Sequence, residues 1–176
     1  TAVAVAWWSR GDTGPLHERV GYAVIALLAA RLAWGFCGGR YARFAQFVRA
    51  PQATIAYARA ALKGKAPRYI GHNPLQQWTY TGVYVLFTTM VVTGLALYAL
   101  YEPRHWFYRW FMPLNDLIGI PYVRLVHLIG MWCFIIFAMI HVYLSILSGN
   151  VDRDGTISSM FSGGRWLRKG VKFRDE

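Results

Sequence analysis

Long apolar stretches alternate with shorter polar ones along this chain. An α-helix needs about 20 apolar residues to cross the hydrocarbon layer of a membrane. The pattern predicts membrane-spanning helices over 17–37, 75–101 and 121–147, each opening at or just after a proline. Residues 1–8, TAVAVAWW, are interpreted as the end of a further spanning helix whose first half precedes Thr1. We therefore predict an all-α, integral membrane four-helix bundle with its first helix truncated in this chain.

The polar connections complete a single membrane-embedded domain over 1–176. The longest connection, 38–74, contains PQATIAYARAALKG, which begins at Pro51 and places apolar and basic side chains on opposite sides of a helix. Such a helix lies on a membrane surface, so an interfacial helix is expected here. The connection 102–120 is rich in aromatic and basic residues and is a candidate for another. The chain ends in a tail over 148–176.

Composition and charge support a membrane protein and give its orientation. Hydrophobic residues make up 56% of the chain and charged residues 15%, against about 25% charged in soluble domains. The net charge is +11. The pattern shows no soluble basic domain that would carry this charge and bind nucleic acid. Most basic residues lie in the 38–74 loop and the C-terminal tail, which the positive-inside rule places in the cytoplasm. The expected location is the bacterial inner membrane, with 9–16 and 102–120 in the periplasm.

Histidines inside the apolar stretches carry the main chemical signal. An ionisable side chain there is costly and usually has a polar partner or a ligand. His127 and His141 are fourteen residues apart, which is two heptads, so both project from one stripe of a helix about 21 Å apart. This geometry suits two stacked haems, one toward each membrane face. His17 begins the first full stretch at the depth of His127, so these two could clamp one haem iron.

Glycines follow both histidines of this pair. Gly21 and Gly130 lie about one turn beyond His17 and His127, where a missing side chain lets a flat macrocycle approach the helix. Ordinary helix packing is the alternative reading of both glycines. The two cysteines of the chain form no C-x-x-C-H motif. Any haem would therefore be held by coordination alone, as haem b.

Three arginines are candidates for pairing with haem propionates. Arg19 and Arg124 lie close to the paired histidines in sequence and could bind the propionates of their haem. Arg31 falls at the depth of His141, where it would pair with a propionate of the second haem or extend to the cytoplasmic surface.

His72 and Asn73 stand in Gly-His-Asn-Pro, just before the second full stretch. An imidazole and a carboxamide there could hydrogen-bond a quinone carbonyl and relay its proton. The simpler alternative is a helix-start turn, which asparagine and proline both favour.

Several segments together resemble a known family. RYIGHNPLQQ, TGLALY, VRLVHLIGMW with IHVY, and DGTISSMFSGG are similar to the b-type cytochrome subunit of membrane-bound nickel–iron hydrogenases. That group belongs to the bacterial cytochrome b561, hydrogenase and formate dehydrogenase gamma superfamily, and the resemblance runs from about Ala2 to the C-terminus. It implies that His17 and His127 bind a periplasmic-side haem. It also implies that His141 binds a cytoplasmic-side haem with a first-helix histidine that this sequence does not contain.

The resemblance further implies a role in electron transport in a respiratory chain. Members take electrons from a periplasmic iron–sulfur small subunit and pass them to membrane quinone, menaquinone or ubiquinone. We expect a subunit of an oxidoreductase complex rather than an enzyme by itself, with a second copy of the chain as a candidate dimer partner. The alternatives are a free-standing di-haem cytochrome b, a formate dehydrogenase gamma-type subunit and a haem-free structural anchor. A proton relay between His127 and His141 would need polar steps that LIGMWCFIIFAMI lacks.

Overall fold

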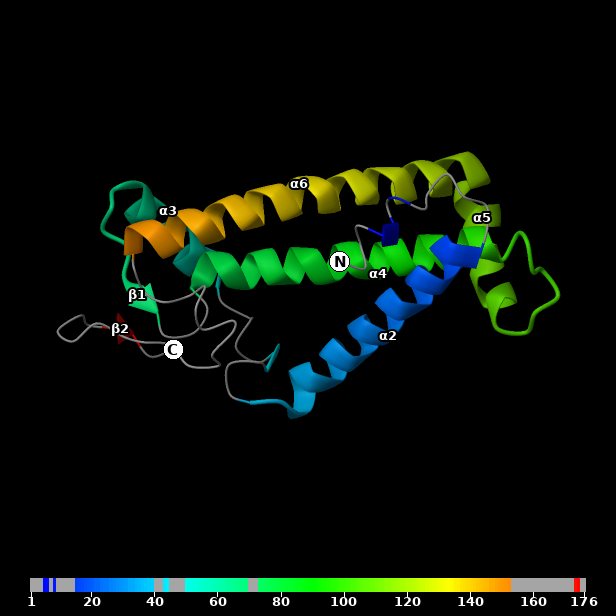
Figure 1. Ribbon diagram of the computed structural model, residues 1–176, viewed down its shortest axis with the longest axis horizontal. Helices are drawn as coiled ribbons and strands as arrows, with labels where there is room; N and C mark the ends of the chain where they lie inside the picture. Colours follow the sequence, from blue (N-terminus) through cyan, green and yellow to red (C-terminus); the bar gives the residue numbers. More distant parts are fainter. Residues whose placement is uncertain are drawn as a thin grey trace.

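Three long helices dominate the computed structural model of the chain (Figure 1). They are α2 (Pro15–Cys37), α4 (Pro74–Tyr98) and α6 (Ile120–Asp152). Each contains a segment long and apolar enough to cross a membrane. The structure describes residues 5–6, 8, 15–39, 43–44, 50–69, 73–152 and 173–174.

The predicted all-α class is confirmed, with small differences at the helix ends. α4 ends at Tyr98, earlier than expected, because the chain turns over 99–101. α6 continues past its predicted end to Asp152. Of the predicted first helix, residues 5, 6 and 8 are helical and the rest lie outside the described residues, as does most of the tail. A two-residue parallel ladder joins β1 (Arg68–Tyr69) to β2 (Phe173–Arg174).

The helix predicted in the long connection is α3 (Pro51–Leu62), and its first residue is the expected proline. Its apolar side chains lack cover from the rest of the described chain, since Leu62 is 90% exposed and Ile55 51%. The Thr54 hydroxyl lies 3.5 Å from the Pro74 carbonyl, which connects α3 to the start of α4. The helical conformation agrees with the sequence prediction.

The aromatic connection folds into two short helices, η4 (Tyr108–Phe111) and α5 (Met112–Ile118). Asn115 fixes α5 to α4, because its buried amide nitrogen donates to the Ala96 carbonyl at 2.6 Å. Tyr108 fixes η4 to α2 through a hydrogen bond between its hydroxyl and that of Tyr22.

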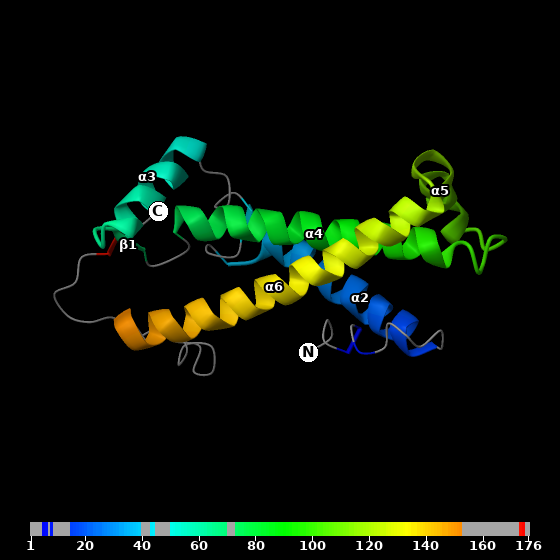
Figure 2. The same ribbon diagram turned by 90° about the horizontal axis from the view of Figure 1, so that it is seen from above.

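α4 and α6 separate toward the α3 end in Figure 2, and α2 starts on the α5 side of the molecule and diverges from α4 in Figure 1. Seen from above in Figure 2, α6 crosses α4 near α5. Small buried side chains lie at this junction: Ala96 of α4 and Ala99 directly after it are fully buried, and Val123 of α6 is 1% exposed. Small residues let helix backbones approach closely in membranes. The α5 end is therefore where side chains from all three helices can meet.

Gly130 is a packing contact between α4 and α6. A side-chain carbon added at Gly130 would overlap the Met90 side chain and lie 3.6 Å from Leu86. The space beside Gly130 is therefore filled by α4. This favours the packing reading of Gly130 over the alternative of an approach for a haem.

We expect Gly130→Leu to lower the free energy of unfolding by about 1–3 kcal/mol, because the added side chain overpacks the α4–α6 contact. Gly82→Leu on α4 is the matched control, because a carbon added at Gly82 meets no described atom within 4 Å. Thermal melting in detergent, followed by circular dichroism, measures both. Equal melting temperatures for the two variants would contradict the packing contact.

Candidate functional site

His17 and His127 meet where the helices converge. His17 lies in the first turn of α2, His127 lies in the first third of α6, and both rings are partly buried. Their ring centroids are 6.4 Å apart and the ring planes are inclined by 74°. The structure therefore brings together the two histidines that the sequence analysis matched by depth.

A backbone carbonyl determines which nitrogen of His17 carries the proton. The Nδ1 atom lies 3.0 Å from the Ala6 carbonyl oxygen. A carbonyl can only accept a hydrogen bond, so Nδ1 is the protonated nitrogen. The Nε2 atom of neutral His17 consequently keeps its lone pair for a ligand.

A threonine on α4 determines which nitrogen of His127 carries the proton. The Thr93 hydroxyl lies 2.9 Å from His127 Nδ1 and donates its own hydrogen to the Thr89 carbonyl at 2.7 Å. A hydroxyl has a single hydrogen, so Thr93 accepts from the Nδ1–H group of His127. The Nε2 lone pair of His127 is therefore also left for a ligand.

The arrangement of the two rings fits one metal ion between two imidazoles. An imidazole nitrogen binds a transition-metal ion at about 2.0–2.1 Å, which places the centroids of two opposed rings about 6 Å apart. The observed separation is 6.4 Å, and two rings can hold an angle of 74° when both planes contain the line through the metal. Two ligands are fewer than the four of a structural zinc site, and a pair of histidines is a donor set that haem iron takes. The donor set therefore fits a bis-histidine haem.

Glycines flank the paired rings in different ways. Gly94 of α4 approaches His127 directly, because an added side-chain carbon would lie 3.2 Å from its Cε1 atom. A carbon added at Gly21 of α2 would meet no described atom within 4 Å, so the helix surface beyond His17 is open there. Space for a flat group therefore lies on the α2 side, whereas Gly130 of α6 faces Met90.

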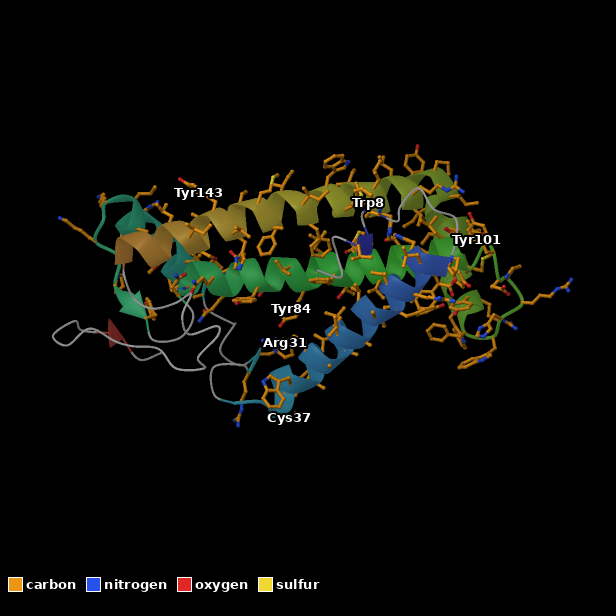
Figure 3. All side chains as sticks on the ribbon, viewed as in Figure 1. Trp8, Arg31, Cys37, Tyr84, Tyr101 and Tyr143 are labelled. Atoms are coloured by element: carbon orange, nitrogen blue, oxygen red, sulfur yellow. The ribbon has the colours of Figure 1, made fainter. Side chains whose placement is uncertain are left out.

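The three predicted arginines occupy two different settings. Arg19 and Arg124 are exposed, each close in sequence to one of the paired histidines. Arg31 is partly buried, and its guanidinium carbon lies 5.7 Å from the Tyr84 ring centroid. Figure 3 shows these two side chains pointing toward each other between α2 and α4. The guanidinium of Arg31 therefore lies over the face of the Tyr84 ring. A cation–π contact there offsets part of the free-energy cost of removing this charge from water.

His141 lies apart from the paired histidines, farther along α6. Its ring is exposed and stacks on Phe137, with centroids 5.5 Å apart and an interplanar angle of 22°. Its backbone carbonyl accepts a hydrogen bond from the Ser145 hydroxyl at 2.7 Å. The structure does not bring His141 to His17 or His127.

Asn73 caps α4, and His72 lies outside the described residues. The Gln76 backbone N–H donates to Asn73 Oδ1 at 2.8 Å, and the Asn73 backbone N–H donates to Gln76 Oε1 at 3.0 Å. This reciprocal pair is a capping box. The helix-start reading of Asn73 is therefore confirmed.

The sequence analysis missed Thr93 and the contact that Gly94 makes. Both residues lie in TGLALY, which was noted only for its resemblance to a family. A threonine within a spanning helix usually bonds its own backbone, so its sequence position alone gives no sign of a partner 34 residues away. The distinguishing feature is burial, because Thr93 is only 5% exposed.

Comparisons with known proteins cover almost the whole chain. The family described as prokaryotic cytochrome b561 matches residues 2–163. No solved structure matches this chain.

Several curated relatives carry the name probable Ni/Fe-hydrogenase B-type cytochrome subunit. The relative from Azotobacter vinelandii is 32% identical over 164 residues, which is 86% of this chain and 68% of that protein. The one from Bradyrhizobium diazoefficiens is 29% identical over 86% of this chain and 66% of its own length. A probable Ni/Fe-hydrogenase 1 B-type cytochrome subunit from Escherichia coli strain K12 is 26% identical over 85% of this chain and 68% of its own length.

This chain spans about two thirds of the length of these relatives. Its match to the family extends over all three spanning helices, from residue 2 to residue 163, and includes both paired histidines. The chain therefore belongs to the prokaryotic cytochrome b561 family.

Proposed function

We propose that this chain is a haem b-containing membrane subunit that passes electrons from a periplasmic hydrogenase-type partner to membrane quinone. The observation that carries the proposal is the pair of imidazoles of His17 and His127, with ring centroids 6.4 Å apart and Nδ1 of each hydrogen-bonded, which leaves Nε2 for a ligand. A bound haem supplies the one-electron chemistry. His17 and His127 would hold the haem, and the chain would fix their tautomers and surround them with apolar helices.

Side chains around the pair would hold the haem in place. The exposed guanidinium groups of Arg19 and Arg124 would bind its propionates through charge-assisted hydrogen bonds. The open helix surface at Gly21 would let the macrocycle approach α2. The missing side chain at Gly94 would leave room for the ring of His127, since an added carbon there would lie 3.2 Å from its Cε1 atom.

A second haem would use His141 with a ligand from outside the described residues. His141 lies on the same helix as His127, about 21 Å along its axis, and its ring is exposed rather than covered by another helix. Arg31 lies toward that end of α2 and could exchange its contact with the Tyr84 ring for one with a propionate.

The electron route follows from the charges of the connections. The basic 38–74 loop and the C-terminus would face the cytoplasm and the α5 end the periplasm of a bacterial inner membrane. An iron–sulfur small subunit would deliver electrons at the His17–His127 end. Quinone would be reduced near His72 and Asn73, where an imidazole could donate a proton. The names of the relatives support the hydrogenase-type partner, and residues 1–176 would act as one membrane-embedded domain.

Replacing His17 or His127 with alanine should abolish one haem signal, because each variant removes one of its two axial ligands. Pyridine haemochrome spectra of the purified protein, with haem counted per polypeptide, measure this. His105→Ala is the control, since His105 is exposed in the aromatic connection and stacks on Trp106 and Tyr108. A colourless wild-type protein would instead support the haem-free anchor, and haem retained by both variants would overturn the ligand assignment.

His141→Ala should lower the haem content per polypeptide by about half, because His141 serves the second of two haems. The haem that remains should be the one lost in His17→Ala, recognised by its absorption and reduction potential. An unchanged haem content in His141→Ala would show that no haem is bound there.

His72→Ala should slow the oxidation of the reduced haem by quinone about 10²-fold, the low end of what a positioned general acid contributes. Stopped-flow absorbance with a soluble quinone measures the rate, and haem content should stay at the wild-type level. Asn73→Asp is a useful companion, because aspartate keeps the cap of α4 but removes the amide donor. A wild-type rate in His72→Ala would place quinone reduction elsewhere.

A further inference from the structure

We propose that Thr93 is a positioning residue that sets the orientation and the electron-donor strength of His127, and through them the reduction potential of the haem at the His17–His127 pair. The inference rests on the proposed function, because it concerns the ligand field of that haem. It assigns a role to a side chain on α4, a helix that supplies no ligand of its own.

The hydrogen bonding of Thr93 differs from that of the other threonines of α4. The other four have hydroxyls that donate to the carbonyl four residues earlier in the same helix; they are Thr79, Thr81, Thr88 and Thr89. Thr93 makes this bond at 2.7 Å and also reaches His127 Nδ1 on α6 at 2.9 Å. It is 5% exposed, so water does not compete strongly for its hydroxyl oxygen.

One hydrogen bond from α4 fixes the imidazole of His127, and the next residue leaves room for it. Thr93 accepts from Nδ1–H, while a side-chain carbon added at Gly94 would lie 3.2 Å from Cε1. The bond at Nδ1 favours one orientation of the ring, and the missing side chain at Gly94 lets the ring lie close to α4. The rings of His17 and His127 are inclined by 74° in this arrangement.

The same hydrogen bond affects the iron. An acceptor on Nδ1–H makes an imidazole more basic and a stronger electron donor to a metal bound at Nε2. A stronger donor stabilises ferric over ferrous iron and therefore lowers the reduction potential. The acceptor for His17 is the Ala6 backbone carbonyl, which no side-chain substitution removes. Thr93 is thus the position at which a change of side chain can alter this ligand field.

Thr93→Val tests the proposal, because valine keeps the shape of threonine and removes the hydroxyl. We expect haem to remain bound, its reduction potential to rise and the ferric low-spin electron paramagnetic resonance signal to shift. A tenfold loss of ferric preference corresponds to about 59 mV for a one-electron couple. Thr93→Ser, which keeps the hydroxyl, should restore both values. Thr88→Val should leave them unchanged, because Thr88 bonds only the Tyr84 carbonyl among the described residues.

The measurements use the purified haem-loaded protein, with a spectroelectrochemical titration of the haem that His17→Ala removes. Loss of haem in Thr93→Val but not in Thr93→Ser would also support the proposal, because serine keeps the hydroxyl that valine lacks. A wild-type potential and resonance signal in Thr93→Val would overturn it, as would equal changes in the valine and serine variants. Absence of haem from the wild-type protein would instead reject the proposed function.

Discussion

Two imidazoles 110 residues apart in the sequence meet between apolar helices, and the rest of the α5 end is arranged around that contact. The ring centroids of His17 and His127 are 6.4 Å apart, so the first turn of α2 must lie near the first third of α6. α4 and the residue directly after it complete the junction with fully buried Ala96 and Ala99. Larger side chains at these two positions would hold the helices apart, and the rings could then no longer share one ligand.

Buried polar groups usually need hydrogen-bond partners, because an unsatisfied one costs about 1–3 kcal/mol. Among the described residues, Nδ1 of each ring has a hydrogen-bond partner: the Ala6 carbonyl for His17 and the Thr93 hydroxyl for His127. The second nitrogen of each ring remains a lone pair in apolar surroundings. A metal bound there would satisfy both lone pairs at once, so cofactor binding should stabilise the fold as well as support electron transfer.

The two ends of the bundle differ in ways that match their proposed tasks. At the α5 end the helices converge, and Tyr108 and Asn115 tie the connection to α2 and α4. At the α3 end the helices separate, and the exposed His141 ring stacks on Phe137 of its own helix. The tied end would hold the ligands of the proposed haem in one geometry, while the open end would leave room for further ligands.

The sequence by itself determined the three spanning helices, since apolar length and proline turns depend only on local residues. It also matched His17 with His127, because depth in a membrane follows from position along a helix. Tertiary structure decided which neighbours act on the ligands: Gly130 faces Met90, Gly94 faces His127, and Thr93 accepts from its ring. These contacts depend on how α4 and α6 cross and are rotated against each other. Interhelical packing sets that arrangement, and no periodicity within one helix encodes it.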